Sequence, residues 1–276
     1  MQTENTDITD EEVGLILYVI FDKYGYDFRD YSHASIYRRI SRYMEERKYT
    51  TAAQLITQLR KDPSEFELFL QRITVNVTEM FRDPEFYTVL AEKVLPLIAT
   101  YPIIKIWHAG CSSGEEVFSL AILLHEAGLL QRSKIYATDI NPLNIEKAKK
   151  GILLMEGMKE YTSNYIKAGG KEDFASYYTA RYNHAIINKD LRNSILFSQH
   201  NLVTDQVFNE FQLILCRNVM IYFNKDLQNK VIRLFYNSLS TFGFLALGIK
   251  ESLLFSDLKD NFENVAVREK IYRRIR

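Results

Sequence analysis

From about residue 103 onward, short apolar runs alternate with longer amphipathic segments, and this alternation limits the possible folds sharply. Ile103–Ala109 has the pattern of a buried strand, and Glu115–Ala127 has that of a helix. Lys134–Ala137 and Pro142–Lys150 repeat the pair. Strands and helices in this order pack as a mainly parallel sheet with helices on both faces. The sequence therefore predicts a doubly wound α/β domain.

The alternation continues toward the C-terminus with one interruption. Tyr161–Arg192 contains the pair Gly169-Gly170, many tyrosines and mixed charge instead of a clear period, and we expect an insertion here. The elements expected beyond it are strands at Ile195–Ser198, Phe211–Cys216 and Phe244–Leu247, a helix at Asp226–Ser240, and a closing strand with a basic edge that takes in Val265, Val267 and the run Lys270–Arg276.

The N-terminal region has a different pattern. From Thr9 to about Ile73, apolar residues recur at helical spacing with no good strand signal between them. Thr9 followed by Glu12 is typical of a capping box, and Asp62-Pro63 marks the start of a later helix. The expected domains are a helical domain at residues 1–75, a linker at 76–99 and the α/β domain at 100–276, with the insertion at about 161–192.

The composition argues against several classes of function. Lysine plus arginine equals aspartate plus glutamate at 35 each, so the chain has no excess of positive charge for a nucleic acid partner. Cys111 and Cys216 form no CxxC pair, and the five histidines show no metal-ligand spacing, so we expect neither a disulfide framework nor a metal. The N-terminus is polar and acidic, and no apolar run approaches the roughly 18 residues of a membrane span. These features predict a cytoplasmic protein that does not itself sit in a membrane.

A short loop with two glycines follows the first predicted strand of the sheet. Gly110 and Gly114 flank Cys-Ser-Ser, and glycines let a backbone turn sharply and approach a ligand closely. Asp139 stands at the tip of the next strand, where its carboxylate can accept hydrogen bonds from both ribose hydroxyls of an adenosine cofactor. A two-glycine loop at a strand end is equally compatible with a tight turn that binds nothing, but Asp139 at this spacing favours a cofactor site.

The residues after this loop bear on which cofactor would bind. A pyrophosphate is favoured at a helix N-terminus, but Glu115 and Glu116 at the start of this helix would repel it. Two carboxylates favour a cationic ligand, for which the sulfonium and ammonium groups of S-adenosylmethionine (SAM) are the obvious candidate. Glu115 and Glu116 could equally serve only to favour the first helical turn.

Four stretches of the sequence carry a resemblance to a known family. They are Thr74–Asp83 (TVNVTEMFRD), Ala109–Glu116 (AGCSSGEE), Ala137–Ile140 (ATDI) and Cys216–Phe223 (CRNVMIYF). In sequence and order they resemble the signature segments of the chemoreceptor glutamate methyltransferases, the CheR family, and the resemblance covers almost the whole chain. Two departures are Val117, where the family usually has proline, and His108, where it has a small residue.

The resemblance implies a helical N-terminal domain, a class I methyltransferase domain with a Rossmann-like doubly wound sheet, and a small β-subdomain inserted in it. It also implies that the chain uses SAM, releases S-adenosylhomocysteine, and esterifies glutamate side chains in the acidic helical cytoplasmic region of a chemoreceptor or similar signalling protein. Together with the loop residue Gly110, the positions that match the family's cofactor site are Asn76, Thr78, Arg82, Glu115, Asp139, Asn201, Leu202, Arg217 and Asn218.

The resemblance also implies roles for single residues. Arg82 can pair with the methionine carboxylate of SAM, Glu115 can meet its ammonium group, and Asn201 can hydrogen-bond the adenine edge. Arg82 and Tyr222 would stand at the reacting end of the cofactor and orient the two reactants. A glutamate side chain, with a pKa of about 4.3, is already ionised at neutral pH, so no general base is expected.

Two other functions are compatible with the sequence. The chain could be a domain that binds SAM and partners without turnover, or a methyltransferase that acts on another substrate. Arg217-Asn218-Val219-Met220 occupies the place where methyltransferases of base amino groups commonly carry an Asn-Pro-Pro-Tyr segment, which argues against a nucleic acid substrate.

Two segments are candidates for contact with a protein substrate. Along Ser35–Lys48 the apolar side chains fall on one helical face, which leaves Arg38, Arg39 and Arg42 toward solvent as a basic patch that suits an acidic helix. A solvated face that neighbouring glutamates partly neutralise explains the same pattern equally well. The insertion matches the family poorly, and we expect the chain not to depend on a receptor tail peptide that adds a strand to the β-subdomain.

Overall fold

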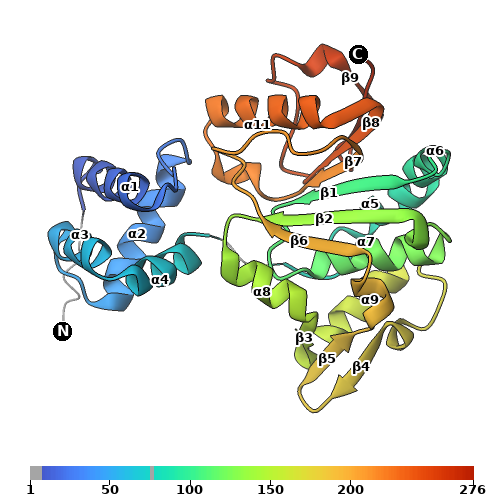
Figure 1. Ribbon diagram of the computed structural model, residues 1–276, viewed down its shortest axis with the longest axis horizontal. Helices are drawn as coiled ribbons and strands as arrows, with labels where there is room; N and C mark the ends of the chain where they lie inside the picture. The colour runs from blue at the N-terminus through green and yellow to red at the C-terminus, as the bar shows by residue number, and fades with distance from the viewer. Residues whose placement is uncertain (1–7, 75–77) are drawn as a thin grey trace. The chain divides into compact units, whose positions relative to one another are not determined.

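The computed structural model describes residues 8–74 and 78–276. The chain divides into two compact units (Figure 1). The first unit holds the residues up to Val75 together with Tyr222–Lys230, and the second holds Asn76–Ile221 and Val231–Arg276. The predicted doubly wound α/β sheet is confirmed and lies in the second unit.

Four helices make up most of the first unit: α1 (Asp10–Tyr24), α2 (His33–Arg47), α3 (Ala52–Lys61) and α4 (Pro63–Ile73). The expected capping box begins α1, because the Thr9 side chain accepts a hydrogen bond from Glu12 N and the Glu12 carboxylate accepts one from Thr9 N. Asp62 caps α4 in front of Pro63, as the sequence indicates.

The first unit also holds a segment from much later in the chain. Ser32 N donates a hydrogen bond to Tyr222 O over 2.7 Å. Phe223 is buried, and its ring lies 5.0 Å from that of Tyr31 in an edge-to-face arrangement. Helix α11 (Lys225–Ser238) starts in this segment and ends in the second unit.

A seven-stranded sheet forms the centre of the second unit, in the order β6-β2-β1-β7-β8-β10-β9. Its strands are β1 (Ile104–Ala109), β2 (Ser133–Asp139), β6 (Ile195–Gln199), β7 (Phe211–Cys216), β8 (Leu239–Leu247), β9 (Phe262–Ala266) and β10 (Ile271–Arg274). The first five pair in parallel, and β10 runs antiparallel to β8 and β9. The strand order reverses between β1 and β7, and open α/β sheets bind ligands at the carboxyl ends of the strands beside such a reversal.

Side chains of β1 point alternately to the two faces of the sheet. Ile104 and Ile106 belong to the core that also contains residues of α7 (Glu115–Glu126). Trp107 points to the opposite face, where its ring lies 5.3 Å from that of Phe235 in α11. Both faces of the sheet are therefore covered by helices.

The other helical segments of the second unit are α5 (Pro84–Val89), the π-helical η1 (Leu90–Val94), α6 (Leu95–Ile98), α8 (Pro142–Lys150), α9 (Met158–Lys167), α10 (Lys189–Arg192) and the 3₁₀ turns η2 (Leu130–Arg132), η3 (Met155–Gly157), η4 (Phe174–Tyr177) and η6 (Lys259–Asn261). Asn141 caps α8 by accepting a hydrogen bond from Leu143 N.

Within residues 8–74 and 78–276, no helix combines the length and the apolar composition that crossing a membrane requires.

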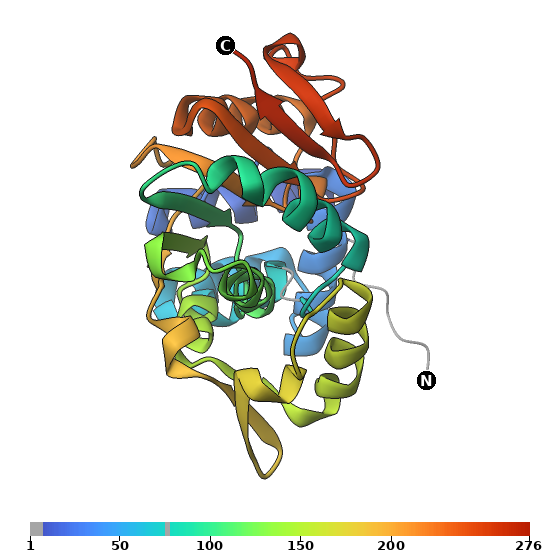
Figure 2. The same ribbon diagram turned by 90° about the vertical axis from the view of Figure 1, so that its right-hand side faces the viewer.

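A separate three-stranded antiparallel sheet forms the inserted β-subdomain, in the order β3-β5-β4. Its strands are β3 (Ile152–Leu154), β4 (Tyr178–Arg181) and β5 (His184–Ile187). The hairpin of β4 and β5 projects away from the main sheet (Figure 2). β3 precedes Tyr161, the expected start of the insertion, and this run of three residues is too short to show a strand period in the sequence.

Two expectations near the C-terminus are wrong. The predicted helix through Ser240 ends at Ser238, and β8 begins directly after it instead of at Phe244. The single closing strand is two strands, β9 and β10, because the backbone turns between them, with Lys270 at a φ of 57° and Val267 exposed.

Candidate functional site

The predicted site residues of the second unit lie mostly in loops that follow the carboxyl ends of β1, β2, β6 and β7. Because these strands are parallel, the loops meet at one edge of the sheet. Gly110 N and Cys111 N both donate to Thr138 O over 2.8 Å, which joins the loop after β1 to the end of β2.

Two glycines allow these loops to approach one another closely. Gly110 has a φ of 79°, and a Cβ atom at this position would overlap the side chain of Val219 in the loop after β7. At Gly248, which follows β8, a Cβ atom would lie 2.8 Å from both Asn218 N and Glu251 Oε2. Neither position can carry a larger residue unless a loop moves.

Several residues without the freedom of glycine also hold left-handed backbone here, namely Phe81, Asp83, Ser112 and Asn218, with φ between 49° and 60°. Such conformations cost of the order of 1–3 kcal/mol each and persist only where the surroundings hold them. Ser119 Oγ accepts from Phe81 N over 2.9 Å, and the carboxylate of Asp139 accepts from Ser112 N. Backbone of this kind gathers at ligand sites more often than elsewhere.

Asp139, at the end of β2, holds three groups of the protein. Its Oδ1 accepts from Asn141 N over 2.9 Å and from Asn144 Nδ2 over 3.2 Å, and its Oδ2 accepts from Ser112 N over 2.9 Å. Burial raises the pKa of this carboxyl group. Because each carboxylate oxygen has two lone pairs, Oδ2 alone keeps an acceptor position, which leaves room for one ribose hydroxyl instead of the expected two.

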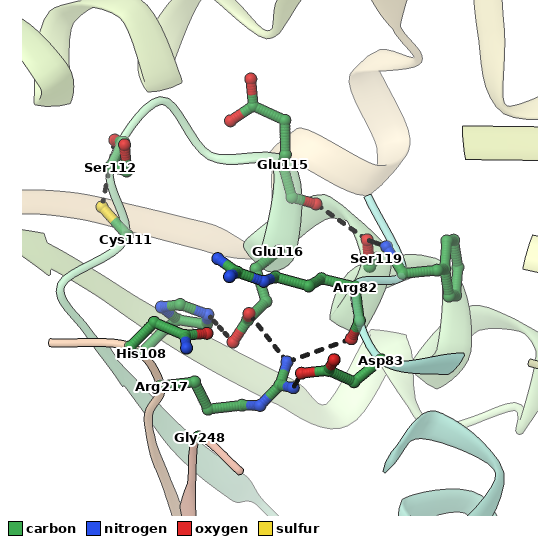
Figure 3. A network of polar contacts seen from close by, with 12 residues as sticks. Arg82, Asp83, His108, Cys111, Ser112, Glu115, Glu116, Ser119, Arg217 and Gly248 are labelled. Atoms are coloured by element: carbon green, nitrogen blue, oxygen red, sulfur yellow. Dashed lines mark hydrogen bonds and ion pairs between the residues drawn. The ribbon is translucent and has the colours of Figure 1, made fainter. Parts of the chain in front are cut away.

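Glu115 begins α7, and its carboxylate accepts a hydrogen bond from Ser113 Oγ over 2.7 Å. Burial raises the pKa of this carboxyl group, while the hydrogen bond from Ser113 opposes the rise. Figure 3 shows the carboxylate pointing away from the ion pairs around Glu116. The charge of Lys147 also lowers the pKa of Glu115, but in the described part of the chain no cation forms an ion pair with it, so its carboxylate can meet a cationic group of a ligand.

Glu116 is tied into a buried chain of charges (Figure 3). Arg217 Nη1 donates to Glu116 Oε2 over 2.9 Å, and Arg217 Nη2 donates to Asp83 Oδ2 over 2.6 Å. His108 Nε2 lies 3.1 Å from Glu116 Oε1, and the Arg217 guanidinium lies over the ring of Phe86. Burial by itself raises the pKa of Glu116, but Arg217 and His108 hold that pKa below its usual value. Of the two carboxylates expected to face a cation, only Glu115 is therefore available.

Arg82 lies beside this network. Its carbonyl oxygen accepts from Arg217 Nη1 over 3.3 Å. Its guanidinium extends past Glu116 toward His108 in Figure 3 and makes no hydrogen bond or ion pair with any residue that the structure describes. A half-buried cation of this kind is available for an anionic group of a ligand.

Glu251 anchors a second cluster. Its Oε1 accepts from Val219 N over 2.9 Å and from Met220 N over 2.7 Å, and its Oε2 accepts from Asn218 N over 3.0 Å and from Gly248 N over 2.6 Å. Burial raises the pKa of Glu251, while the four backbone donors oppose the rise. One side chain after β8 thus fixes the loop after β7.

The other predicted cofactor residues of this unit have simpler surroundings. Asn201 Oδ1 accepts from Val203 N over 3.0 Å in a tight turn after β6, which leaves its Nδ2 group for an adenine edge. Leu202 is buried and Thr78 is half-buried. Asn76 lies outside the described residues.

In the first unit, the basic face of α2 differs from the expectation at one position. Arg38 and Arg42 are exposed, as predicted, but Arg39 is half-buried. Arg39 Nη1 donates to Ile73 O over 2.7 Å, and its guanidinium carbon lies 4.8 Å from the centre of the Tyr222 ring. The helical period of α2 predicts that Arg39 faces solvent. It gives no indication that residues 222–224, far along the chain, pack against this helix.

Two family models match the sequence. The model described as "CheR methyltransferase, SAM binding domain" matches residues 76–271, and "CheR methyltransferase, all-alpha domain" matches residues 11–74. The chain belongs to the CheR methyltransferase family. This confirms the resemblance seen in the four motifs and makes the α/β unit a SAM-binding methyltransferase domain.

Proteins of similar sequence also carry the names of methyltransferases. A Pseudomonas putida protein named "Putative methyltransferase Cher3" is 50% identical over 96% of this chain and 97% of its own. A chemotaxis protein methyltransferase of Listeria innocua is 31% identical over 83% of this chain and 86% of its own. One of Salmonella typhimurium is 29% identical over 97% of this chain and 89% of its own.

The site of this CheR family member fits SAM at several points. Arg82 and Glu115 carry opposite charges and lack ionic partners among the described residues, as a zwitterionic methionine group requires. Ser112 Oγ and Asn218 Oδ1 are buried, and neither has a hydrogen-bond partner among the described residues. Both atoms can therefore bond to polar groups of a ligand.

Asp83, His108 and Glu251 were not among the residues predicted for the CheR site. Glu251 had a usable signal, because it is an acidic residue shortly after another parallel strand and so belongs to the same sheet edge. Asp83 ends the first family segment and Arg217 stands in the last, but the two are 134 positions apart, and no local pattern in the sequence indicates that they pair.

Proposed function

We propose that this chain transfers the methyl group of SAM to glutamate side chains in the acidic helical cytoplasmic region of a chemoreceptor-like protein, forming glutamyl methyl esters in signal adaptation. The observation that best supports this use of the site is the Arg82 guanidinium, which forms no hydrogen bond or ion pair with a described residue and lies beside the buried pair of Arg217 and Glu116. The names of the Listeria and Salmonella relatives connect those proteins with chemotaxis.

Methyl transfer to a glutamate side chain requires little acid–base catalysis from the protein. SAM supplies an electrophilic methyl group on its sulfonium sulfur. The substrate carboxylate, with a usual pKa of about 4.3, is an ionised nucleophile at neutral pH. The residues of the site therefore act by binding, orienting and excluding water.

Each polar residue of the site then has a definite role. Arg82 binds the methionine carboxylate, and Glu115 binds the ammonium group. Asp139 accepts from one ribose hydroxyl through Oδ2, and Asn201 donates to the adenine edge through Nδ2. Tyr222 orients the reacting groups through its hydroxyl.

Arg217 and Asn218 differ in role, although both match the family's cofactor positions. The terminal nitrogens of Arg217 are occupied by Glu116, Asp83 and the carbonyl of Arg82, so Arg217 holds the backbone of Arg82 in place. Asn218 Oδ1 is buried and has no hydrogen-bond partner among the described residues, so it can accept a hydrogen bond from the cofactor.

The exposed arginines Arg38 and Arg42 are the proposed docking residues for an acidic helix, since their charges reach solvent. We also propose that docking does not require a receptor tail peptide added to the β-subdomain. Titration of the protein with an aromatic-acidic tail pentapeptide checks this, because micromolar binding that is lost on changes within residues 161–192 would show a tether site.

A labelling experiment tests the proposed reaction. The protein is incubated with methyl-labelled SAM and the cytoplasmic fragment of a chemoreceptor, and we expect label that mild base releases, as from a methyl ester. Replacing the receptor's acceptor glutamates with alanine should abolish it. Label that resists base, or that appears on another substrate, contradicts the proposal, and SAM binding without any transfer would favour a non-catalytic binding domain.

A further inference from the structure

The backbone around Tyr222 is held by the N-terminal part of the chain. Ser32 N donates to Tyr222 O over 2.7 Å, and Asn224 N donates to Asp30 O over 2.9 Å. Asn224 Nδ2 also donates to Asp30 Oδ1 over 3.3 Å. Because Ser32 is the N-cap residue of α2, these bonds bring Tyr222 to the start of that helix.

Arg39, in the second turn of α2, lies against the ring of Tyr222. The distance of 4.8 Å from the guanidinium carbon to the ring centre is within the range of a cation–π interaction. Arg39 Nη1 donates to Ile73 O over 2.7 Å, and Arg39 Nε donates to Ser35 Oγ over 3.3 Å. Two hydrogen bonds thus fix the guanidinium that lies over the ring.

The neighbouring arginines lack these contacts. Arg38 makes no hydrogen bond or ion pair within the described residues, and Arg42 bonds to Glu46 over 3.2 Å at the surface. Burial lowers the pKa of Arg39, and its interaction with Tyr222 opposes that change. A docking residue needs an exposed charge, whereas the charge of Arg39 is already engaged inside the unit.

We propose that Arg39 is a positioning residue for Tyr222, which fixes the direction of the tyrosine hydroxyl by holding one face of its ring. The consequence for turnover rests on the orienting role of Tyr222 in the proposed function. On this basis α2 serves catalysis through its half-buried Arg39 and substrate docking through its exposed arginines.

Steady-state kinetics with SAM and the receptor fragment test the proposal. Arg39→Met keeps much of the side chain's length but removes the guanidinium, and we expect kcat to fall tenfold or more while KM for the receptor fragment changes less than about twofold. Lys61→Met, an exposed change in α3, is the control and should leave both constants unchanged. An Arg39→Met protein with a raised KM and normal kcat would make Arg39 a docking residue and overturn the proposal.

A double variant tests whether the effect of Arg39 on kcat depends on Tyr222. In a Tyr222→Phe protein, Arg39→Met should reduce kcat by less than a further twofold, because both changes act through one hydroxyl. A full additional loss would mean that Arg39 acts by another route. If Arg39→Met does not fold, Arg39→Lys carries the same comparison, since it keeps a charge but loses the flat guanidinium.

A spectroscopic measurement separates this contact from the proposed reaction. In protein labelled with 3-fluorotyrosine, the ¹⁹F resonance of Tyr222 is identified by its loss in Tyr222→Phe. Arg39→Met should shift it, and Lys61→Met should not. An unchanged resonance in folded Arg39→Met contradicts the positioning role. A shifted resonance with normal kcat in both Arg39→Met and Tyr222→Phe supports the positioning contact and rejects the catalytic role of Tyr222.

Discussion

Arg217 Nη1 donates to Glu116 Oε2 over 2.9 Å, and this ion pair joins the loop after β7 to the first turn of α7. Both side chains are almost fully enclosed, so removing Arg217 would leave the buried Glu116 carboxylate without its guanidinium partner, at a cost of about 3–5 kcal/mol. Removing Glu116 would leave Arg217 paired with Asp83 alone. The same guanidinium donates to the carbonyl of Arg82. The pair therefore fixes the backbone of the residue that we assign to the cofactor's carboxylate.

Arg82→Ala should weaken SAM binding by about 1.5–3 kcal/mol, because a charged hydrogen-bonding group is removed from the ligand. The melting temperature should change little, since no described residue bonds to this guanidinium. Titration calorimetry measures the affinity, and Arg233→Ala, at a side chain 57% exposed, is the control. Wild-type affinity in Arg82→Ala would place the methionine carboxylate elsewhere.

Asp139→Ala should weaken SAM binding by about 1–3 kcal/mol and also lower the melting temperature, because three protein donors lose their acceptor. Asp139→Asn keeps an acceptor oxygen and should recover part of both losses. Calorimetry and thermal melting follow the two effects separately. Unchanged affinity in a folded Asp139→Ala protein would mean that Asp139 serves only the loops.

Glu115 should make SAM binding depend on pH. Burial raises the pKa of its carboxyl group above the usual value for glutamate, and the ammonium group of SAM favours the ionised form. Affinity should therefore rise with pH through this raised pKa and level off above it. Glu115→Gln should bind more weakly at neutral pH and lose most of the slope, whereas Glu146→Gln, at an exposed side chain, should keep the slope. Equal slopes in wild type and Glu115→Gln would exclude Glu115 as the group that meets the ammonium.

Glu251→Gln should lower the free energy of unfolding by about 1–3 kcal/mol, because an amide can accept through one oxygen only and its NH₂ group faces backbone donors. Glu251→Ala should cost more, since all four N–H groups lose their acceptor. Denaturant unfolding gives both values. Glu263→Gln, at an exposed site in β9, is the control, and equal stability of Glu251→Gln and wild type would show that water can replace this carboxylate.

Arg38→Glu should raise KM for an acidic receptor fragment more than Arg42→Glu, because the charge of Arg42 is partly neutralised by Glu46. The increase should shrink as salt is added, since the contact lies at the surface. Lys61→Glu makes the same charge change on α3 and should have little effect. If all three variants share the wild-type KM, the face of α2 is merely solvated.

The sequence predicts the elements of the main sheet because each depends on local periodicity. Ile103–Ala109 and Phe211–Cys216 are apolar runs of strand length, and both appear as parallel strands, the first starting one residue later and the second with the predicted bounds. β9 and β10 were merged into one strand because Val267, an apolar residue, lies in the exposed turn between them.

Residues of the candidate site could be predicted only where a single local motif contains them. Glu115 and Asp139 follow predicted strands, so their placement at the sheet edge follows from the order of elements. The pairing of Glu116 with Arg217 joins residues 101 positions apart, and no local period contains it. The half-buried state of Arg39 likewise depends on Tyr222, which reaches α2 only through the tertiary fold.

The return of residues 222–230 to the first unit limits how the chain can be divided. The two family models meet between residues 74 and 76, but a chain shortened to residues 76–276 would lose Ser32, which donates to Tyr222 O, and Tyr31, which packs on Phe223. A chimera that exchanges only the N-terminal helices between relatives would place foreign side chains against Tyr222. Successful exchanges should therefore transplant residues 222–230 together with the helices, as one cassette.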